Sequence, residues 1–141
     1  MSTRPAARDP SERSANTTTS TALRLGRLLY GGVLALMAAD GLRNAEERAQ
    51  YADSKGVPMP ALSNTVAHYT LLFGGLGVSL WRLPRLATAA IAAFFLGVTP
   101  MMHDFWSVAD PDERQQQQIQ FLKNTALFGT ALVLLGVASA E

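Results

Sequence analysis

Polar side chains that could bind a ligand stand at the edges of the apolar stretches of this chain. The segment HDFWSVADPDERQQQQIQFLKN, residues 103–124, has a histidine and an aspartate at its start and a lysine and an asparagine at its end. Histidine, carboxylate, amide and ammonium groups are suited to hydrogen-bonding a polar headgroup or to moving protons. With three more polar residues that border apolar stretches, the candidate ligand-binding cluster has seven members: Asp40, Asn64, His68, His103, Asp104, Lys123 and Asn124.

Four apolar segments must position this cluster. They run over residues 22–42, 62–81, 86–102 and 121–138 of the 141-residue chain, in which 48% of the residues are hydrophobic and 16% are charged. Each segment is near the ~20 residues that a helix needs to cross a bilayer, and a helix satisfies its own backbone in lipid. A soluble bundle would show a polar stripe on each helix, which the third segment lacks. We therefore expect an all-α fold, an integral membrane four-helix bundle.

The parts outside these segments have their own signatures. Residues 1–20 are rich in Ser, Thr, Arg and Pro and lack apolar periodicity, so we expect a disordered N-terminal tail before a four-helix membrane domain at residues 21–141. The stretch NAEERAQYADSKG, residues 44–56, has a helical composition and closes on Gly56. Glycines such as Gly74 and Gly75 in the second segment let helix backbones approach closely in lipid.

Lysine and arginine residues predict the orientation. One side carries seven of them and the other side four: Arg4, Arg8, Arg13, Arg24, Arg27, Arg82 and Arg85 against Arg43, Arg48, Lys55 and Arg114. The positive-inside rule then predicts a multi-pass protein of the cell membrane with both termini in the cytoplasm. Following the four segments back and forth places the whole polar cluster at one level, at the outer side of the membrane.

Several kinds of chemistry are disfavoured. The net charge of +1 and the lack of a basic face argue against nucleic acid as a partner, and the chain has no cysteine for thiol chemistry. Its two histidines lie on different segments without a second ligand at helical spacing, so we expect no metal and no intrinsic cofactor. A quinone headgroup suits such a cluster, because it needs an apolar cleft and a few hydrogen-bonding side chains.

The chain resembles the DoxX family of small four-helix membrane proteins, from about Leu28 to Gly136. The resemblance rests on GVP at residues 56–58, the pair Gly74–Gly75, WRLPR at residues 81–85, HDFW at residues 103–106 and FLKN at residues 121–124. It implies an association with membrane oxidoreductase systems, since the founding type is similar to a subunit of a thiosulfate:quinone oxidoreductase. Relatives often have a glutamate one turn before the glycine pair, where this chain has Leu71.

Two hypotheses for function remain open, and whether the protein is an enzyme stays undecided between them. In the first, the chain is a quinone-linked or redox-associated accessory subunit, in contact with membrane lipids and with an oxidoreductase partner subunit that carries the redox cofactor. His68, His103 and Lys123 would contact the headgroup, and Asp104 and Asn124 would orient them. In the second, the chain is a structural or scaffolding protein whose polar residues bond internally, with Asp40 paired to Arg43 or Lys123.

Overall fold

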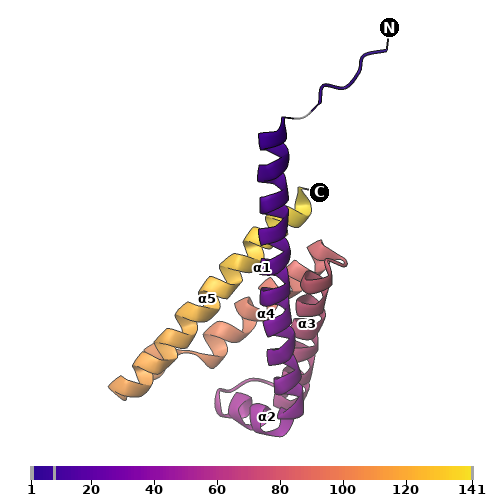
Figure 1. Ribbon diagram of the computed structural model, residues 1–141. Coiled ribbons are helices and arrows are strands. Elements are labelled where there is room, and N and C mark those ends of the chain that lie inside the picture. The colour runs from indigo at the N-terminus through magenta and orange to yellow at the C-terminus, as the bar shows by residue number, and fades with distance from the viewer. Residues whose placement is uncertain (1, 8, 141) are drawn as a thin grey trace.

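The computed structural model describes residues 2–7 and 9–140, and it describes side chains outside residues 12–20. The described chain is all-α, which confirms the expected class. Five α-helices and one 3₁₀ helix follow one another (Figure 1): α1 (Pro10–Arg43), α2 (Ala45–Ser54), α3 (Pro60–Leu80), α4 (Pro84–Met102), η1 (Phe105–Ser107) and α5 (Pro111–Ser139). The helix expected in residues 44–56 is α2, and Gly56 follows it with a φ of 76°.

The two longest helices begin about ten residues before the apolar segments that predict them. Asp9 accepts a hydrogen bond from the backbone N–H of Ser11, and Pro10 is the first residue of α1. Asp110 likewise accepts from the N–H of Glu113, before Pro111. An N-cap aspartate followed by proline starts a helix regardless of hydrophobicity, so residues 10–20 of the expected tail are helical. Met1 and Arg8, which also belong to that tail, lie outside the described residues.

Three of the helices are long and apolar enough to cross a membrane. They cover Thr21–Arg43, Pro84–Ser107 and Pro111–Ser139. The fourth expected span, residues 62–81, coincides with α3, which has 21 residues but is not apolar enough to qualify by composition alone. The reason is that α3 carries Asn64 and His68 in its first half, together with several hydroxyl side chains.

Helix α3 lies at the centre of the bundle and packs against α1, α2 and α4. Its two adjacent glycines face two different neighbours. A Cβ on Gly75 would stand 2.7 Å from the carbonyl oxygen of Gly31 and 2.8 Å from the N atom of Ala35, both in the backbone of α1. A Cβ on Gly74 would stand 2.6 Å from Ile91 Cγ1 and 2.9 Å from the carbonyl oxygen of Ala87, in α4. The pair therefore sets both helix crossings, which confirms the expected role of small residues.

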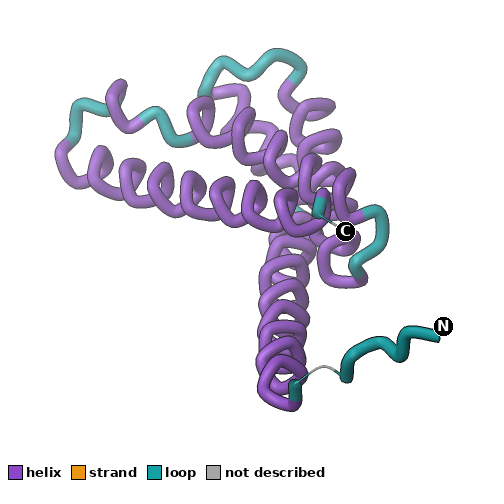
Figure 2. Tube along the Cα trace, turned by 90° about the horizontal axis from the view of Figure 1, so that it is seen from above, coloured by secondary structure: helices purple, strands orange, loops and turns teal. Residues whose placement is uncertain are grey.

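Helix α5 is held differently. It packs on α4, crosses α1 near its own C-terminal half, and diverges from α1 toward its N-terminal end (Figure 1). The view from above shows the same divergence (Figure 2). Where the two helices meet, the Tyr30 hydroxyl donates a hydrogen bond of 2.5 Å to the carbonyl oxygen of Leu127. Helix α2 lies at the opposite end of the bundle from the C-terminus, beside the end of α1 (Figure 1).

The glycine pair can be tested by substitution. We expect Gly75→Ala to destabilise the protein by about 1–3 kcal/mol, because the added methyl group meets backbone atoms that cannot rotate away. Gly97→Ala in α4 is the matched control, since nothing lies within 4 Å of its added Cβ. Thermal unfolding in detergent, followed by circular dichroism, should show a lower midpoint for Gly75→Ala alone. Equal midpoints for the two variants would contradict the proposed backbone contact.

Candidate functional site

Helix α3 presents two of the predicted residues to the end of α1. Asn64 is buried, and its side-chain N–H lies 3.4 Å from the carbonyl oxygen of Gly41. The ring of His68 lies directly against Gly41, where a Cβ would overlap ring atoms Cδ2 and Nε2. Gly41 thus leaves the space that the imidazole fills. The sequence analysis missed this residue, although Gly41 follows Ala38 at a spacing that keeps both on the α3-facing side of α1.

The imidazole of His68 is fixed on two sides. Its Nδ1 lies 2.8 Å from the backbone carbonyl oxygen of Asn64, one turn earlier in α3. The ring also meets Phe94 of α4 edge to face, with centroids 5.9 Å apart. Because the ring is half-buried and held by a backbone acceptor and an aromatic edge, its orientation follows from the packing of α1, α3 and α4.

His103 comes from the end of α4 and reaches α5. It is the C-terminal cap of α4, where its backbone N–H donates to the carbonyl oxygen of Thr99 over 3.0 Å. Its Nδ1 lies 2.8 Å from the side-chain oxygen of Gln117 in α5. The polar run at the start of α5 therefore supplies a partner that the sequence analysis did not assign.

Asp40 pairs with neither of the two partners expected from the sequence. Its carboxylate lies 2.9 Å from the guanidinium of Arg48 in α2, and Asn44 donates to its other oxygen over 3.0 Å. The predictions of Arg43 and Lys123 were wrong because α2 folds back immediately after Asn44 and brings Arg48 over the end of α1. Tyr51, one turn beyond Arg48, donates its hydroxyl to the carbonyl oxygen of Met102 over 3.2 Å. Both side chains join α2 to the site, and the sequence analysis missed both.

These residues line a single cleft of about 630 Å³ between the diverging helices. It includes five of the seven predicted residues and has both a polar and an apolar part. The polar lining residues are Asp40, Arg48, Tyr51, Asn64, His68, His103, Gln120 and Asn124, and the apolar ones are Leu36, Met37, Leu71, Phe94, Phe95, Val98 and Met102. Leu36 is 71% exposed, so the α1 side of the cleft is open rather than enclosed.

The structure does not bring Asp104 and Lys123 to the cleft. Asp104 forms an ion pair with Lys55, at 2.8 Å, and both side chains are partly buried. The hydrogen bond to Asp104 raises the pKa of Lys55, so this cation stays charged throughout the neutral range. Lys123 is exposed and has no hydrogen-bond or ion-pair partner among the described residues. The physical reason is helical: Asn124 turns into the cleft, and the side chain one residue earlier points about 100° away.

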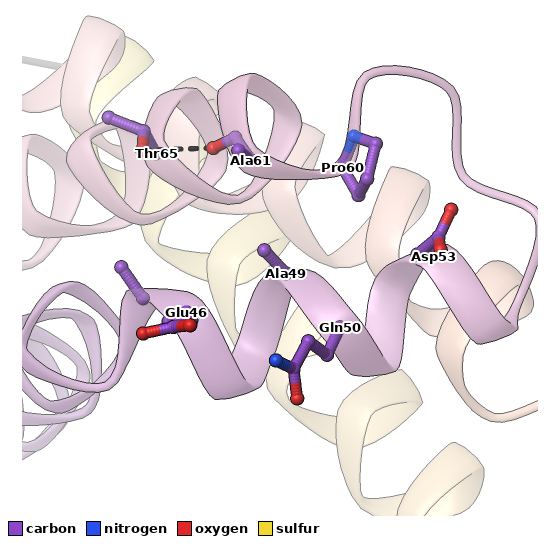
Figure 3. A pocket seen from close by; sticks show the side chains of 8 residues that line it. Glu46, Ala49, Gln50, Asp53, Pro60, Ala61 and Thr65 are labelled. Carbon is purple, nitrogen blue, oxygen red and sulfur yellow. Dashed lines mark hydrogen bonds between the residues drawn. The ribbon is translucent and has the colours of Figure 1, made fainter.

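A second hollow, of about 470 Å³, lies between α2 and the start of α3. Figure 3 shows its small side chains, Ala49 and Ala61, with Glu46 and Asp53 toward its ends, and the Thr65 hydroxyl bonded to the carbonyl oxygen of Ala61 over 3.0 Å. It has no histidine and only shallow walls. Among residues 2–7 and 9–140, no group of three or more His, Asp or Glu side chains is placed to hold a metal ion.

Comparison with known families identifies the class of protein. The DoxX family model matches residues 22–104, more than half of the chain. The match covers the glycine pair, the WRLPR link and the first two residues of HDFW, and it ends before FLKN. No curated protein and no solved structure matches the chain. The chain belongs to the DoxX family, as the resemblance in its motifs indicates, and with its three apolar helices it is a multi-pass membrane protein.

The contact between Gly41 and His68 generates a prediction. We expect Gly41→Ala to displace the His68 ring and break its bond to the Asn64 carbonyl, because the added methyl group occupies the position of the ring edge. Gly32→Ala on the same helix is the control, since nothing lies within 4 Å of its added Cβ. Imidazole nitrogen shifts measured by NMR should change in Gly41→Ala and stay the same in Gly32→Ala. Unchanged His68 shifts in both variants would contradict the contact.

Proposed function

We propose that this DoxX protein is a quinone-linked accessory subunit of a membrane oxidoreductase system. The single observation that carries the proposal is the cleft of about 630 Å³, whose apolar walls end in a group of polar side chains. A lipid-borne quinone has the matching shape and chemistry, with an apolar tail and a flat headgroup that carries two oxygens. A tightly packed bundle with every polar atom bonded internally would instead have favoured a scaffold.

The apolar part of the cleft supports the placement of a tail. Leu36 and Met37 lie on α1 and are exposed at 71% and 46%, on the side where α1 and α5 diverge. A tail that leaves the cleft between these helices stays in contact with the surrounding lipid. The headgroup then lies against Phe94 and Phe95, whose rings meet edge to face with centroids 5.2 Å apart.

The polar part supports the placement of the headgroup. His68 and Asn64 come from α3, His103 from the end of α4, and Asn124 from α5, so four fixed polar groups converge from three helices. In the proposal His68, His103 and Asn124 contact the headgroup oxygens, while Asn64 orients His68 through its backbone carbonyl. Lys123, which the sequence analysis assigned to the headgroup, has no part in it.

The chain itself supplies no electron carrier in this proposal. Any electron transfer to or from a bound quinone requires a cofactor on a partner subunit. What this chain contributes is a binding site and the orientation of a headgroup near the membrane surface.

We further propose that α3 is the fourth membrane span. With 21 residues it is about 31 Å long, close to the ~30 Å thickness of a bilayer core. The polar residues that lower its hydropathy, Asn64 and His68, face α1 and the cleft. With four spans, the distribution of Lys and Arg supports a topology that has both termini in the cytoplasm and the polar end of the cleft at the outer surface.

Labelling of single cysteines tests this topology, because the natural chain has no cysteine. We expect a membrane-impermeant maleimide to label Asp53→Cys, at the exposed end of α2, in intact cells. Ala140→Cys, which is exposed beyond α5, should be labelled only after permeabilisation. Labelling of both positions from the same side would mean three spans, with α3 outside the bilayer.

Ligand binding tests the function. We expect His68→Phe and Asn124→Leu each to weaken the binding of a decyl benzohydroquinone, the reduced form of a lipid-like quinone, by about tenfold, since each change removes a hydrogen bond and leaves a polar headgroup atom unpaired. Lys123→Ala, outside the cleft on the neighbouring face of α5, is the matched control and should bind as the natural protein does. Calorimetric titration of protein in lipid nanodiscs gives the dissociation constants.

The scaffold hypothesis makes the opposite prediction for the same variants. If the polar residues only stabilise the bundle, His68→Phe and Asn124→Leu lower the thermal midpoint, and the natural protein binds no quinone. If the natural protein binds the ligand and every cleft variant binds it equally strongly, the cleft is also excluded as the binding site.

A further inference from the structure

The two histidines of the cleft share one hydrogen-bonding arrangement. The Nδ1 of His68 lies 2.8 Å from the backbone carbonyl oxygen of Asn64, and the Nδ1 of His103 lies 2.8 Å from the side-chain oxygen of Gln117. A carbonyl oxygen only accepts hydrogen bonds. The Nδ1 of His68 must therefore carry the proton and donate it to the Asn64 carbonyl, which fixes the tautomer of this ring, and the Nδ1 of His103 donates likewise when Gln117 turns its side-chain oxygen toward it.

The other nitrogen of each ring is left for a ligand. Neither Nε2 has a hydrogen-bond partner among the described residues, and neither is among the fully enclosed polar atoms without a partner. In a neutral imidazole whose Nδ1 is protonated, Nε2 is a bare acceptor. Gly41 contributes to this arrangement, because any side chain there would cover the Nε2 of His68.

The remaining polar groups of the cleft do not favour a hydrogen-bond acceptor over a hydrogen-bond donor as the ligand. Arg48, the one arginine in the lining, is held by Asp40, which itself can only accept hydrogen bonds. Tyr51 already donates its hydroxyl to the carbonyl oxygen of Met102. Gln120 and Asn124 each offer both a donor and an acceptor, so they suit either kind of ligand atom. The two histidines therefore decide which hydrogen-bonding pattern the headgroup must have.

We propose that His68 and His103 make the cleft selective for headgroups that donate hydrogen bonds, a dihydroxy ring rather than the dicarbonyl form of the same ring. This inference rests on the proposed function, and it names the redox form that the site prefers. A hydroquinone can donate one O–H to each bare Nε2. A quinone carbonyl in the same position faces the lone pair of the nitrogen and gains no hydrogen bond. The carbonyl oxygen and the nitrogen then both lose their hydrogen bonds to water without a replacement.

Binding of one lipid headgroup in its two oxidation states tests the proposal. The probes are a decyl-substituted benzohydroquinone and the corresponding benzoquinone, titrated into the full chain in nanodiscs. Dithionite keeps the hydroquinone reduced and has no disulfide to attack, since the chain has no cysteine. We expect the hydroquinone to bind at least about tenfold more tightly, as two additional hydrogen bonds would give.

Replacing the acceptors should remove the selectivity without removing the site. In His68→Gln/His103→Gln each amide can turn either its oxygen or its N–H₂ toward the ligand, so the ratio of the two dissociation constants should fall to about two or less. A purely structural role of the histidines would weaken both probes equally and leave the ratio unchanged. Lys123→Ala should keep the natural ratio.

The outcomes separate this inference from the proposed function. Equal affinities of the natural protein for both probes, tighter binding of the quinone, or an unchanged ratio in the double variant would overturn the selectivity while the quinone site stands. Failure of both probes to bind would overturn the two proposals together. Size-exclusion chromatography and the thermal midpoint confirm that each variant is folded before it is titrated.

Discussion

The structure depends on the direct contact of backbones at the centre of α3. In lipid, helices gain little from hydrophobic burial against one another, so close packing has to hold them. Gly75 brings the backbone of α3 onto Gly31 and Ala35 of α1, and Gly74 brings it onto α4. Around these contacts lie the largest fully buried apolar side chains of the core, Leu34, Leu71, Val78, Ile91 and Phe95. The crossings fix the rotation of α3 about its axis, and with it the direction in which Asn64 and His68 point.

The cleft exists because α5 does not share these contacts. It packs on α4 and meets α1 at the Tyr30–Leu127 hydrogen bond, and beyond this bond the two helices separate toward the end where α2 lies. Helix α2 then covers that end with two ion pairs, Arg48 to Asp40 and Lys55 to Asp104. A bundle with four equally close helices would leave no space there. Because α5 packs closely on α4 but not on α1, the cleft has both an apolar opening and a polar end.

The sequence predicts the depth of the polar residues in the bundle better than it predicts the direction and the bonding partner of each side chain. Apolar segments that alternate in direction place residues at equal depth, which is why Asp40, Asn64, His68, His103 and Asn124 do line one cleft. Depth alone does not give the direction of a side chain around its helix, so Lys123 shares the level of these residues but does not line the cleft. Partners from α2 are equally hidden: Arg48 and Tyr51 reach the cleft, and Lys55 at its end reaches Asp104, only because α2 folds back after Asn44. The expected span that does not qualify by its composition alone, α3, is the central helix.

Access to the cleft follows from the open side between α1 and α5. A ligand that arrives there never passes through water, so its supply is set by its mole fraction in the bilayer and by lateral diffusion rather than by its concentration in solution. In the proposed binding mode the exposed Leu36 stands at this boundary, where acyl chains of the annular lipids would compete with the ligand for the same space. Saturation of the site would accordingly vary with membrane composition, even at a constant total amount of ligand per cell.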